Sequence, residues 1–468
     1  MKLKKREPSL FIALLPLAAI ALFLGVGYGV FHIQSESLLV SAAFVTGIIA
    51  AGLGYSWKEM EEGIVASIGK AMPAMLIVIT VGILIGSWIA CGTIPMMIYY
   101  GIKLISPKYF LVTASIVCSL VSLFTGTSWG TVGTIGVAFI GVAKGLGIPV
   151  APAAGAIVAG AYFGDKLSPF SDTTNLAPIV ARSNLFDHIR HLLWTTTPAW
   201  LIGLVLYFFI GLKYRPESLD SSQMDLILNT ISVHFNFNVL LLLPMVIVLY
   251  YAVRKKPTIP GMLIASFTAM LLGLIFQGSS VAESLGAMAV GYKSQTGVAV
   301  VDNLISRGGM AGMMHVTLIA FCAFAFAGIA QSSGMLDVIL KHLLRVAKTP
   351  GKLIAATVGS GIAIALMTGS SFLSILVPGE LYAPAFKKMN LAAKNLSRTT
   401  EDSGTVIVPL VPWSMAGVFM AGTLNVPTLT YLPFTFMCYL GFVFALIYGF
   451  TGFAIAPCIR EDETVPGS

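Results

Sequence analysis

The chain has 468 residues, of which 57% are hydrophobic and only 10% are charged, and its net charge is +8. Soluble globular proteins carry charge on about a quarter of their residues, so this composition excludes an ordinary soluble protein. Nucleic-acid binding is not indicated, because the basic residues flank apolar stretches instead of gathering on a polar face. Apolar stretches of membrane-spanning length recur without the two-residue alternation of a β-barrel, which predicts an all-α, polytopic membrane protein.

Membrane spans are predicted along the whole chain. The first follows a basic segment and is too long for a secretion signal, so we expect it to be retained. A polar segment separates two groups of spans, and several spans are interrupted by glycine or proline, so we predict about 12 to 14 in all. The predicted spans lie near 9–31, 37–55, 72–90, 109–124, 130–148, 150–163, 196–212, 237–253, 258–276, 311–332, 352–368, 372–388, 405–424 and 429–453.

The two groups of spans are related in sequence. "TGTSW" begins at residue 125 and "TGSSF" at residue 368, an offset of 243 residues, and the same offset carries Lys144 onto Lys387. A near-constant offset over a long stretch indicates a duplicated unit. We therefore predict a first repeat of scaffold helices and a transport hairpin, a connecting loop, a second repeat and a polar tail, at 1–212, 213–236, 237–457 and 458–468.

The basic residues predict how the repeats are oriented. They concentrate at 1–8, 253–257 and 341–352, which places these ends and the N-terminus in the cytoplasm. The segment 91–108 then lies outside, although its repeat partner 341–352 lies inside, so the two repeats are expected to have inverted topology. Inverted repeats are typical of secondary transporters, whose substrate site lies between the repeats near the middle of the membrane.

The repeated motif predicts two breaks within membrane helices. Glycine and clustered hydroxyls favour a break, and a serine or threonine caps the helix that follows. Unwound backbone is tolerated in a membrane only where protein covers it or where it lines a cavity, so its carbonyls and hydroxyls become candidate ligands. The alternative is close helix packing through small residues. The candidate site residues are Thr125, Thr127, Ser128, Thr368, Ser370 and Ser371.

A second polar cluster, "GDKLSPFSDTTN" at 164–175, directly follows an apolar span. Pro169 predicts that the incoming helix stops there. A polar loop at the membrane surface is one interpretation, and a site at membrane depth is the other. The candidate site residues of this cluster are Asp165, Asp172, Thr173 and Asn175.

A third cluster, "LSRTTEDSGTVIVPLVPW" at 396–413, contributes Arg398, Glu401 and Asp402. Arg398 and Asp402 are four residues apart, so they share a helix face and could form a surface ion pair. The functional interpretation is a carboxylate at membrane depth that binds a cation or a proton. We expect Asp402 to hold the place in the second repeat that Asp165 holds in the first.

Other polar residues are weaker candidates. His188 and His191 are predicted to lie on an interfacial helix, since no nearby cysteine completes a zinc site. The five cysteines are scattered and are expected to be buried small hydrophobic residues. Glu380 is left open between the site and the membrane interface.

Together, the motif at 125–139 and the clusters at 164–178 and 396–413 resemble the NhaC family of bacterial antiporters. The likeness runs from about residue 70 to residue 425, and it implies inverted repeats, helical hairpins and paired breaks around the substrate. By this resemblance the hydroxyls of both breaks line the site, the second cluster contributes from the hairpin, and Glu401 and Asp402 contribute from the other repeat. The candidates for Na⁺ ligation are Asp165, Asp402, Ser128 and Ser371.

The expected function is an antiporter of the bacterial plasma membrane that couples Na⁺ and H⁺ by alternating access, with no cofactor beyond the transported ions. Members of the family that exchange malate and H⁺ for lactate and Na⁺ provide the alternative. A channel is not favoured, because two inverted halves with unlike acidic clusters do not form a ring around one pore. "YFGD" at 162–165 lacks the first glycine of an intramembrane protease motif, so we expect no enzyme. Membrane lipid is an expected partner, and a homodimer is left open.

Overall fold

A computed structural model describes residues 5–28, 30–31, 33–214, 221–254 and 256–458. The described residues are almost entirely helical, and their only β-type pairing is a single bridge between Leu391 and Pro457. Eight of their helices are long and apolar enough to cross a membrane, or eleven if each of three bent pairs is one span. The polytopic all-α fold is therefore confirmed. The count is below 12 to 14 by this measure, because several predicted spans form shorter or more polar helices.

The first half of the chain contains ten α-helices among its described residues. One is interrupted: α6, a π-helical turn at Val132–Gly136 and α7 together form one irregular helix. The bounds are α1 Leu10–Leu22, α2 Ser35–Gly52, α3 Trp57–Ala90, α4 Thr93–Leu104, α5 Phe110–Thr125, α6 Ser128–Thr131, α7 Val137–Gly145, α8 Val150–Leu167, α9 Asp172–Ala181 and α10 Leu185–Gly211.

The second half begins with a helix that sequence reasoning assigned to a loop. Of the predicted connecting loop at 213–236, residues 221–234 form α11, while 215–220 lie outside the described residues. Of the predicted tail at 458–468, residues 459–468 also lie outside them. The bounds are α11 Ser221–His234, α12 Leu243–Val253, α13 Thr258–Leu272, α14 Val281–Val290, α15 Ala299–Ile305, α16 Met314–Ser332, α17 Met335–Val346, α18 Pro350–Thr368, α19 Ser371–Lys388, α20 Ala393–Ile407, α21 Met415–Leu424, α22 Thr428–Tyr431 and α23 Phe436–Thr451.

Helix boundaries in the two halves follow the register of the sequence repeat. Both ends of α9 and α21 differ by 243 residues, and both ends of α4 and α17 differ by 242. The unusual backbone positions repeat as well, since Arg182 after α9 and Asn425 after α21 are both left-handed, with φ of 60° and 55°. The same local structures therefore recur in the same order in both halves.

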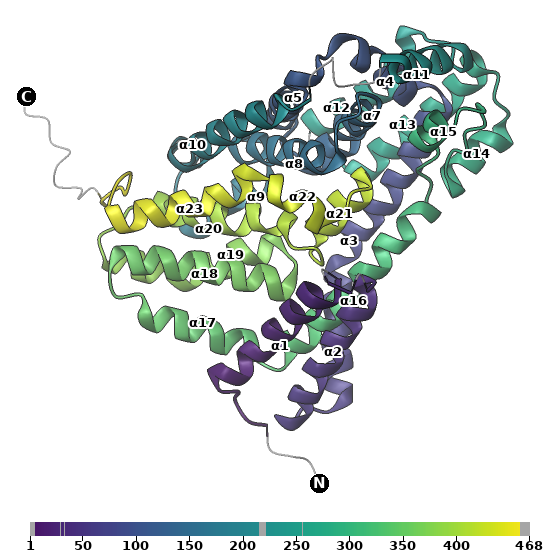
Figure 1. Cartoon of the computed structure of the whole chain (residues 1–468). Helices are drawn as coiled ribbons and strands as arrows, with labels where there is room; N and C mark the ends of the chain where they lie inside the picture. Colours follow the sequence, from purple (N-terminus) through teal and green to yellow (C-terminus); the bar gives the residue numbers. More distant parts are fainter. Residues whose placement is uncertain (1–4, 29, 32, 215–220, 255, 459–468) are drawn as a thin grey trace, which may run out of the picture.

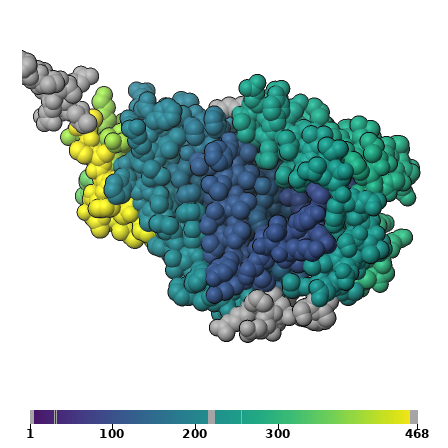
Figure 2. All heavy atoms as spheres, turned by 90° about the horizontal axis from the view of Figure 1, so that it is seen from above, coloured from purple at the N-terminus to yellow at the C-terminus, as the bar shows by residue number. Residues whose placement is uncertain are grey.

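Helices from the two halves are layered against one another (Figure 1). In that view α5, α8 and α10 lie above, α18, α19, α20 and α23 lie below them, and the long helices α3 and α16 flank this stack and pack against each other. Seen from above, the first-half helices in blue lie between the yellow C-terminal helices and the teal residues that follow α10 (Figure 2). Contacts such as α10 with α23 and α20 tie the two halves together.

Helices α5 and α8 pack closely along their length, and glycine makes this possible. A Cβ atom on Gly160 would lie 2.2 Å from the carbonyl oxygen of Ser115, and one on Gly164 would lie 2.1 Å from that of Ser119. Such distances leave no room for any side chain, so the two backbones touch directly. Because Gly164 immediately precedes Asp165, this contact also fixes the position of the Asp165 backbone and therefore of its carboxylate.

We predict that Gly164→Ala destabilises the fold, because a methyl group there must push α5 and α8 apart. Overpacking of this kind costs about 1–3 kcal/mol, which will lower the melting temperature of the protein purified in detergent. The matched control is Gly47→Ala in α2, where a Cβ meets no atom within 4 Å. The control is expected to melt at or above the wild-type temperature, because alanine favours a helix. Equal melting of Gly164→Ala and wild type would contradict the packing argument.

Candidate ion-binding site

The two predicted helix breaks are present and have the same construction. After α5, Gly126 adopts a left-handed φ of 67°, and the Thr127 side chain accepts a hydrogen bond of 3.1 Å from the backbone N–H at the start of the next helix. After α18, Gly369 has φ of 63° and the Ser370 side chain accepts the equivalent bond of 3.4 Å. The prediction that hydroxyls cap the new helices is confirmed.

Each break is covered by the turn that follows in its own repeat. A Cβ on Gly126 would lie 2.6 Å from the backbone of Phe170, in the turn between α8 and α9. In the second repeat a Cβ on Gly369 would lie 3.1 Å from Ser414, and the Met415 N–H donates to the Gly369 carbonyl at 3.1 Å. Protein therefore replaces water as the partner of the broken backbone, as a membrane requires.

A cavity of about 740 Å³ lies between the two breaks. It is lined by both break motifs, by the end of α8 and the start of α9, and by parts of α3, α20 and α21. Nine of the thirteen predicted site residues line it: Thr125, Thr127, Ser128, Asp165, Asp172, Thr173, Thr368, Ser370 and Ser371. The other four, Asn175, Arg398, Glu401 and Asp402, are not among its lining residues.

Asp165 is the buried carboxylate of this cavity. Its side chain sits at the last turn of α8 and accepts a hydrogen bond of 2.8 Å from the Ser128 hydroxyl at the first break. Two further lining hydroxyls, Thr125 and Thr405, are buried and find no hydrogen-bond partner among the described residues. Buried polar atoms are normally satisfied, so oxygens left unpaired around a cavity point to a ligand. This combination of one buried carboxylate and several hydroxyls is suited to a small cation.

The remaining residues of the second cluster differ in their surroundings. Asp172, the first residue of α9, is exposed to the cavity, and Thr173 beside it is half-buried. The Asn175 amide instead donates to the carbonyls of Pro169 and Ser171, at 2.8 and 2.7 Å. Asn175 therefore stabilises the turn between α8 and α9 and does not face the cavity.

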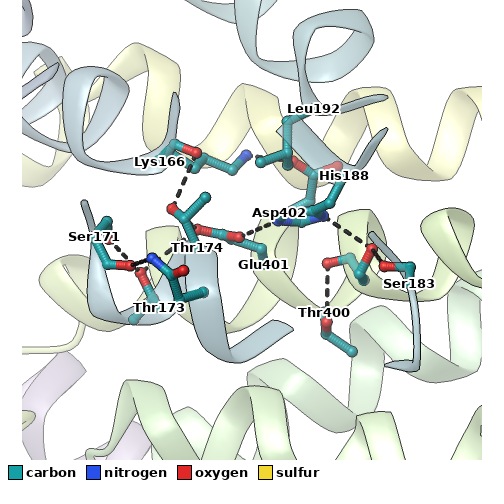
Figure 3. A network of polar contacts seen from close by, with 12 residues as sticks. Lys166, Ser171, Thr173, Thr174, Ser183, His188, Leu192, Thr400, Glu401 and Asp402 are labelled. Atoms are coloured by element: carbon teal, nitrogen blue, oxygen red, sulfur yellow. Dashed lines mark hydrogen bonds and ion pairs between the residues drawn. The ribbon is translucent and has the colours of Figure 1, made fainter. Parts of the chain in front are cut away.

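A second buried polar cluster lies beside the cavity (Figure 3). Within it, Lys166 forms an ion pair with Asp402, and neither side chain is exposed. Thr196 accepts a hydrogen bond of 3.0 Å from Lys166, and Thr195 donates one of 3.0 Å to Asp402. These contacts join α8, α10 and α20. The spacing of Arg398 and Asp402 on one helix face predicted an ion pair between them, but Asp402 pairs instead with Lys166, which is distant in the sequence.

Glu401 in the same cluster pairs with a residue that sequence reasoning missed. His188 Nε2 lies 2.7 Å from Glu401 Oε2, and the Thr174 hydroxyl donates to Glu401 Oε1 at 3.0 Å. The prediction of an interfacial histidine is wrong, because His188 is completely buried. A signal was present in the sequence: His188, His191 and Thr195 recur at helical spacing and form a polar face of α10, which packs against α20.

Arg398 lies away from the cavity. Its Nη1 donates to the Ala454 carbonyl at 2.9 Å, and its guanidinium lies 6.0 Å from the centre of the Tyr448 ring. The nearby Asn395 also bonds the segment after α23, at Ala456, in both directions. Arg398 thus helps to hold the C-terminal segment against the start of α20.

The prediction that Asp402 holds the place of Asp165 in the second repeat is wrong. With α8 and α20 starting 243 residues apart, Val408 corresponds to Asp165, and Ala159 corresponds to Asp402. The segment that matches "GDKLSPFS" is "IVPLVPWS" at 407–414, which shares its leucine, proline, aromatic residue and serine. The two repeats therefore share their helix boundaries here, but the charged residues of one have no counterparts in the other.

The Lys166–Asp402 pair makes a prediction about stability. Removing one member of a buried ion pair leaves the other charge unpaired and costs about 3–5 kcal/mol, whereas replacing both by uncharged residues costs far less. Asp402→Asn is therefore expected to lower the melting temperature strongly, and Lys166→Met combined with Asp402→Asn is expected to restore most of the loss. A double variant no more stable than Asp402→Asn alone would contradict this interpretation.

Comparisons with known proteins agree with the motifs. A profile of the Na⁺/H⁺ antiporter family matches residues 160–453. A Haemophilus influenzae protein named an uncharacterized Na⁺/H⁺ antiporter is 44% identical over 97% of this chain and 98% of its own length. The Na⁺/H⁺ antiporter NhaC of Alkalihalophilus pseudofirmus is 38% identical over 91% and 92% of the two chains. The malate-2H⁺/Na⁺-lactate antiporter of Bacillus subtilis is 34% identical over 96% of each. The chain therefore belongs to the Na⁺/H⁺ antiporter family of membrane transporters.

Proposed function

We propose that this protein exchanges Na⁺ for H⁺ across the bacterial plasma membrane by alternating access. The proposal is based on the cavity that both repeated helix breaks line, with the buried carboxylate of Asp165 held there by Ser128. Discontinuous helices around a central site are the usual construction of a secondary transporter.

The breaks supply the kind of ligands that a small cation needs. α5 ends at Thr125 and α18 ends at Thr368, so the negative ends of two helix dipoles and their free carbonyls reach the cavity. Ser128 and Ser371 add a hydroxyl from each repeat. We propose Asp165, Ser128 and Ser371 as the principal Na⁺ ligands.

One carboxylate provides a mechanism for exchange. A charged carboxylate buried at membrane depth is costly unless a cation or a proton neutralises it. Na⁺ and H⁺ therefore compete for Asp165, and the neutralised site can move between the two sides of the membrane where the empty, charged site cannot. Asp402 is less suited to this role, because Lys166 already neutralises its charge and because it does not line the cavity. We propose that Asp402 balances the charge of Lys166.

We also propose that the N-terminus is cytoplasmic and that the two repeats are inverted. Ion pairs join Lys5 to Glu59 at the start of α3, at 2.7 Å, and Lys341 on α17 to Glu7, at 2.6 Å. The N-terminal segment and the basic helix α17 therefore lie on the same side of the protein. This agrees with the placement that the positive-inside bias predicts for both.

Organic-acid exchange is the second candidate, and the size of the cavity favours it. Small-molecule sites usually measure about 300–1,000 Å³, and 740 Å³ exceeds what one Na⁺ ion needs. Lys70 and Gln331 also line the cavity and could bind a carboxylate. In this version a small acid such as malate or lactate would enter together with the ions.

We predict that a Na⁺ gradient drives H⁺ movement in proteoliposomes of the purified protein without any organic acid. Asp165→Asn is expected to reduce this flux to the level of empty liposomes, because the amide cannot take up the proton. The control is Glu380→Gln, at an exposed residue outside the cavity lining, which is expected to keep the wild-type flux. If Na⁺ moves H⁺ only after malate or lactate is added, organic-acid exchange is the correct function.

A further inference from the structure

We propose that Glu401 and His188 form a proton relay that joins the central cavity to the protein surface at the turn between α9 and α10. The proposal rests on the Na⁺/H⁺ exchange proposed above and assigns the proton a route separate from the Na⁺ ligands around Asp165.

The relay is a continuous chain of polar side chains (Figure 3). From the cavity outward, the Thr173 hydroxyl lies 3.5 Å from Glu401 Oε1, and Glu401 Oε2 lies 2.7 Å from His188 Nε2. On the other face of the imidazole, His188 Nδ1 lies 2.9 Å from the Ser397 hydroxyl, which accepts a hydrogen bond of 3.2 Å from Ser183. Every link is therefore within hydrogen-bond distance.

One end of the relay reaches the cavity and the other end reaches the protein surface. Thr173 lines the cavity. Ser183 is partly exposed in the short turn between α9 and α10, between the exposed residues Arg182 and Asn184. The three residues between these ends, Glu401, His188 and Ser397, are completely buried. The chain thus crosses a dry layer of protein that bulk water does not bridge.

The chemistry of the buried groups suits proton transfer. Imidazole exchanges protons near neutral pH and has two ring nitrogens on opposite sides. A proton accepted at Nδ1 from the Ser397 side and one released at Nε2 to Glu401 leave the ring neutral in its other tautomer. Glu401 becomes a neutral carboxylic acid, protonated at Oε2. The carboxyl group turns so that this proton faces Thr173, and Glu401 is ionised again when the proton passes to the Thr173 hydroxyl, which releases its own hydrogen to the cavity. The ring then rotates to bring its protonated Nδ1 to Glu401 and its bare Nε2 to Ser397, and the next transfer, in at Nε2 and out at Nδ1, returns it to the first tautomer.

The surrounding charges leave Glu401 available for this role. Lys166 and Asp402 neutralise each other, and among the described residues no lysine or arginine forms an ion pair with Glu401. His188 is its one titratable partner within hydrogen-bond distance there. The other charged residues and histidines on the helices that carry the relay are Asp165 and Lys166 on α8, Asp172 on α9, Asp187, Arg190 and His191 on α10, and Lys394, Arg398 and Asp402 on α20.

The start of α9 connects the relay to the cation site. The Thr174 hydroxyl contacts Glu401 Oε1 at 3.0 Å and the carbonyl oxygens of Asp165 and Lys166 at 3.2 and 3.1 Å. A single hydroxyl hydrogen cannot serve all three acceptors fully. Protonation of Glu401 changes which of these acceptors the Thr174 hydroxyl prefers. The charge of Glu401 therefore affects the backbone carbonyl of Asp165, whose side chain lines the cavity.

The test separates proton movement from Na⁺ movement in the full-length protein. In proteoliposomes we would compare Na⁺-driven H⁺ flux with ²²Na⁺/Na⁺ exchange at equal pH, which needs no net proton transfer. His188→Gln and Glu401→Gln are expected to slow the H⁺-coupled flux by roughly 100-fold while ²²Na⁺/Na⁺ exchange persists. The matched control is His191→Gln. His191 is a buried histidine of the same helix that contacts Asn395 and is not part of the relay, so this variant is expected to keep both fluxes.

Each outcome has one meaning. If wild-type protein moves no H⁺ with Na⁺, the proposed function fails before the relay is tested. If wild type does so and His188→Gln matches it, or if the variant loses both fluxes equally, the relay is overturned. Should His188→Gln not fold, Ser397→Ala breaks the same chain at a neutral residue, and an unchanged H⁺-coupled flux in that variant overturns the relay.

Discussion

A helix that stops inside a membrane leaves backbone groups without partners, and the structure of this protein depends on how two such stops are covered. At each stop a left-handed glycine ends one helix, a hydroxyl caps the next, and a turn from the same repeat packs against the glycine. A larger residue at Gly126 would displace Phe170, whose backbone covers the break. What remains uncovered faces the cavity between the repeats, and those carbonyls and hydroxyls are available to a cation.

The two repeats share this backbone but divide the chemistry. Asp165 and Lys166 stand where the second repeat has Val408 and Pro409, and Asp402 stands opposite Ala159. The charges of the two repeats are therefore complementary: the lysine of one pairs with the aspartate of the other, while Asp165 is left to the cavity. Duplication supplies a symmetric backbone, and within it the polar side chains of the two repeats differ.

Local features of the site could be predicted from the sequence, whereas long-range partners could not. Thr-Gly-Thr-Ser predicts a break because glycine, hydroxyl caps and apolar flanks act within a few residues. The burial of Asp165 was suggested by its position directly after an apolar span. The partner of Asp402 was not predictable in this way, because Arg398 shares its helix face but Lys166 reaches it from a helix more than two hundred residues away. His188 was missed for the same reason: only the packing of α10 on α20 brings it to Glu401. The fold class followed from composition alone, but α11 did not, because a short polar helix resembles a loop in sequence.

Both helix breaks line one cavity, and alternating access requires this cavity to open to one side of the membrane at a time. Side-specific labelling of Phe372→Cys by a membrane-impermeant thiol reagent, with the five native cysteines replaced, measures this opening. Phe372 lines the cavity at the second break but is not a proposed Na⁺ ligand, and Asp165 lies beside the first break, so Na⁺ bound at Asp165 should protect the introduced thiol if both line the same site. We predict labelling from one side only under a given condition, protection by Na⁺, and loss of that protection in Asp165→Asn. Equal labelling from both sides at once, or labelling that Na⁺ does not affect, would contradict the account.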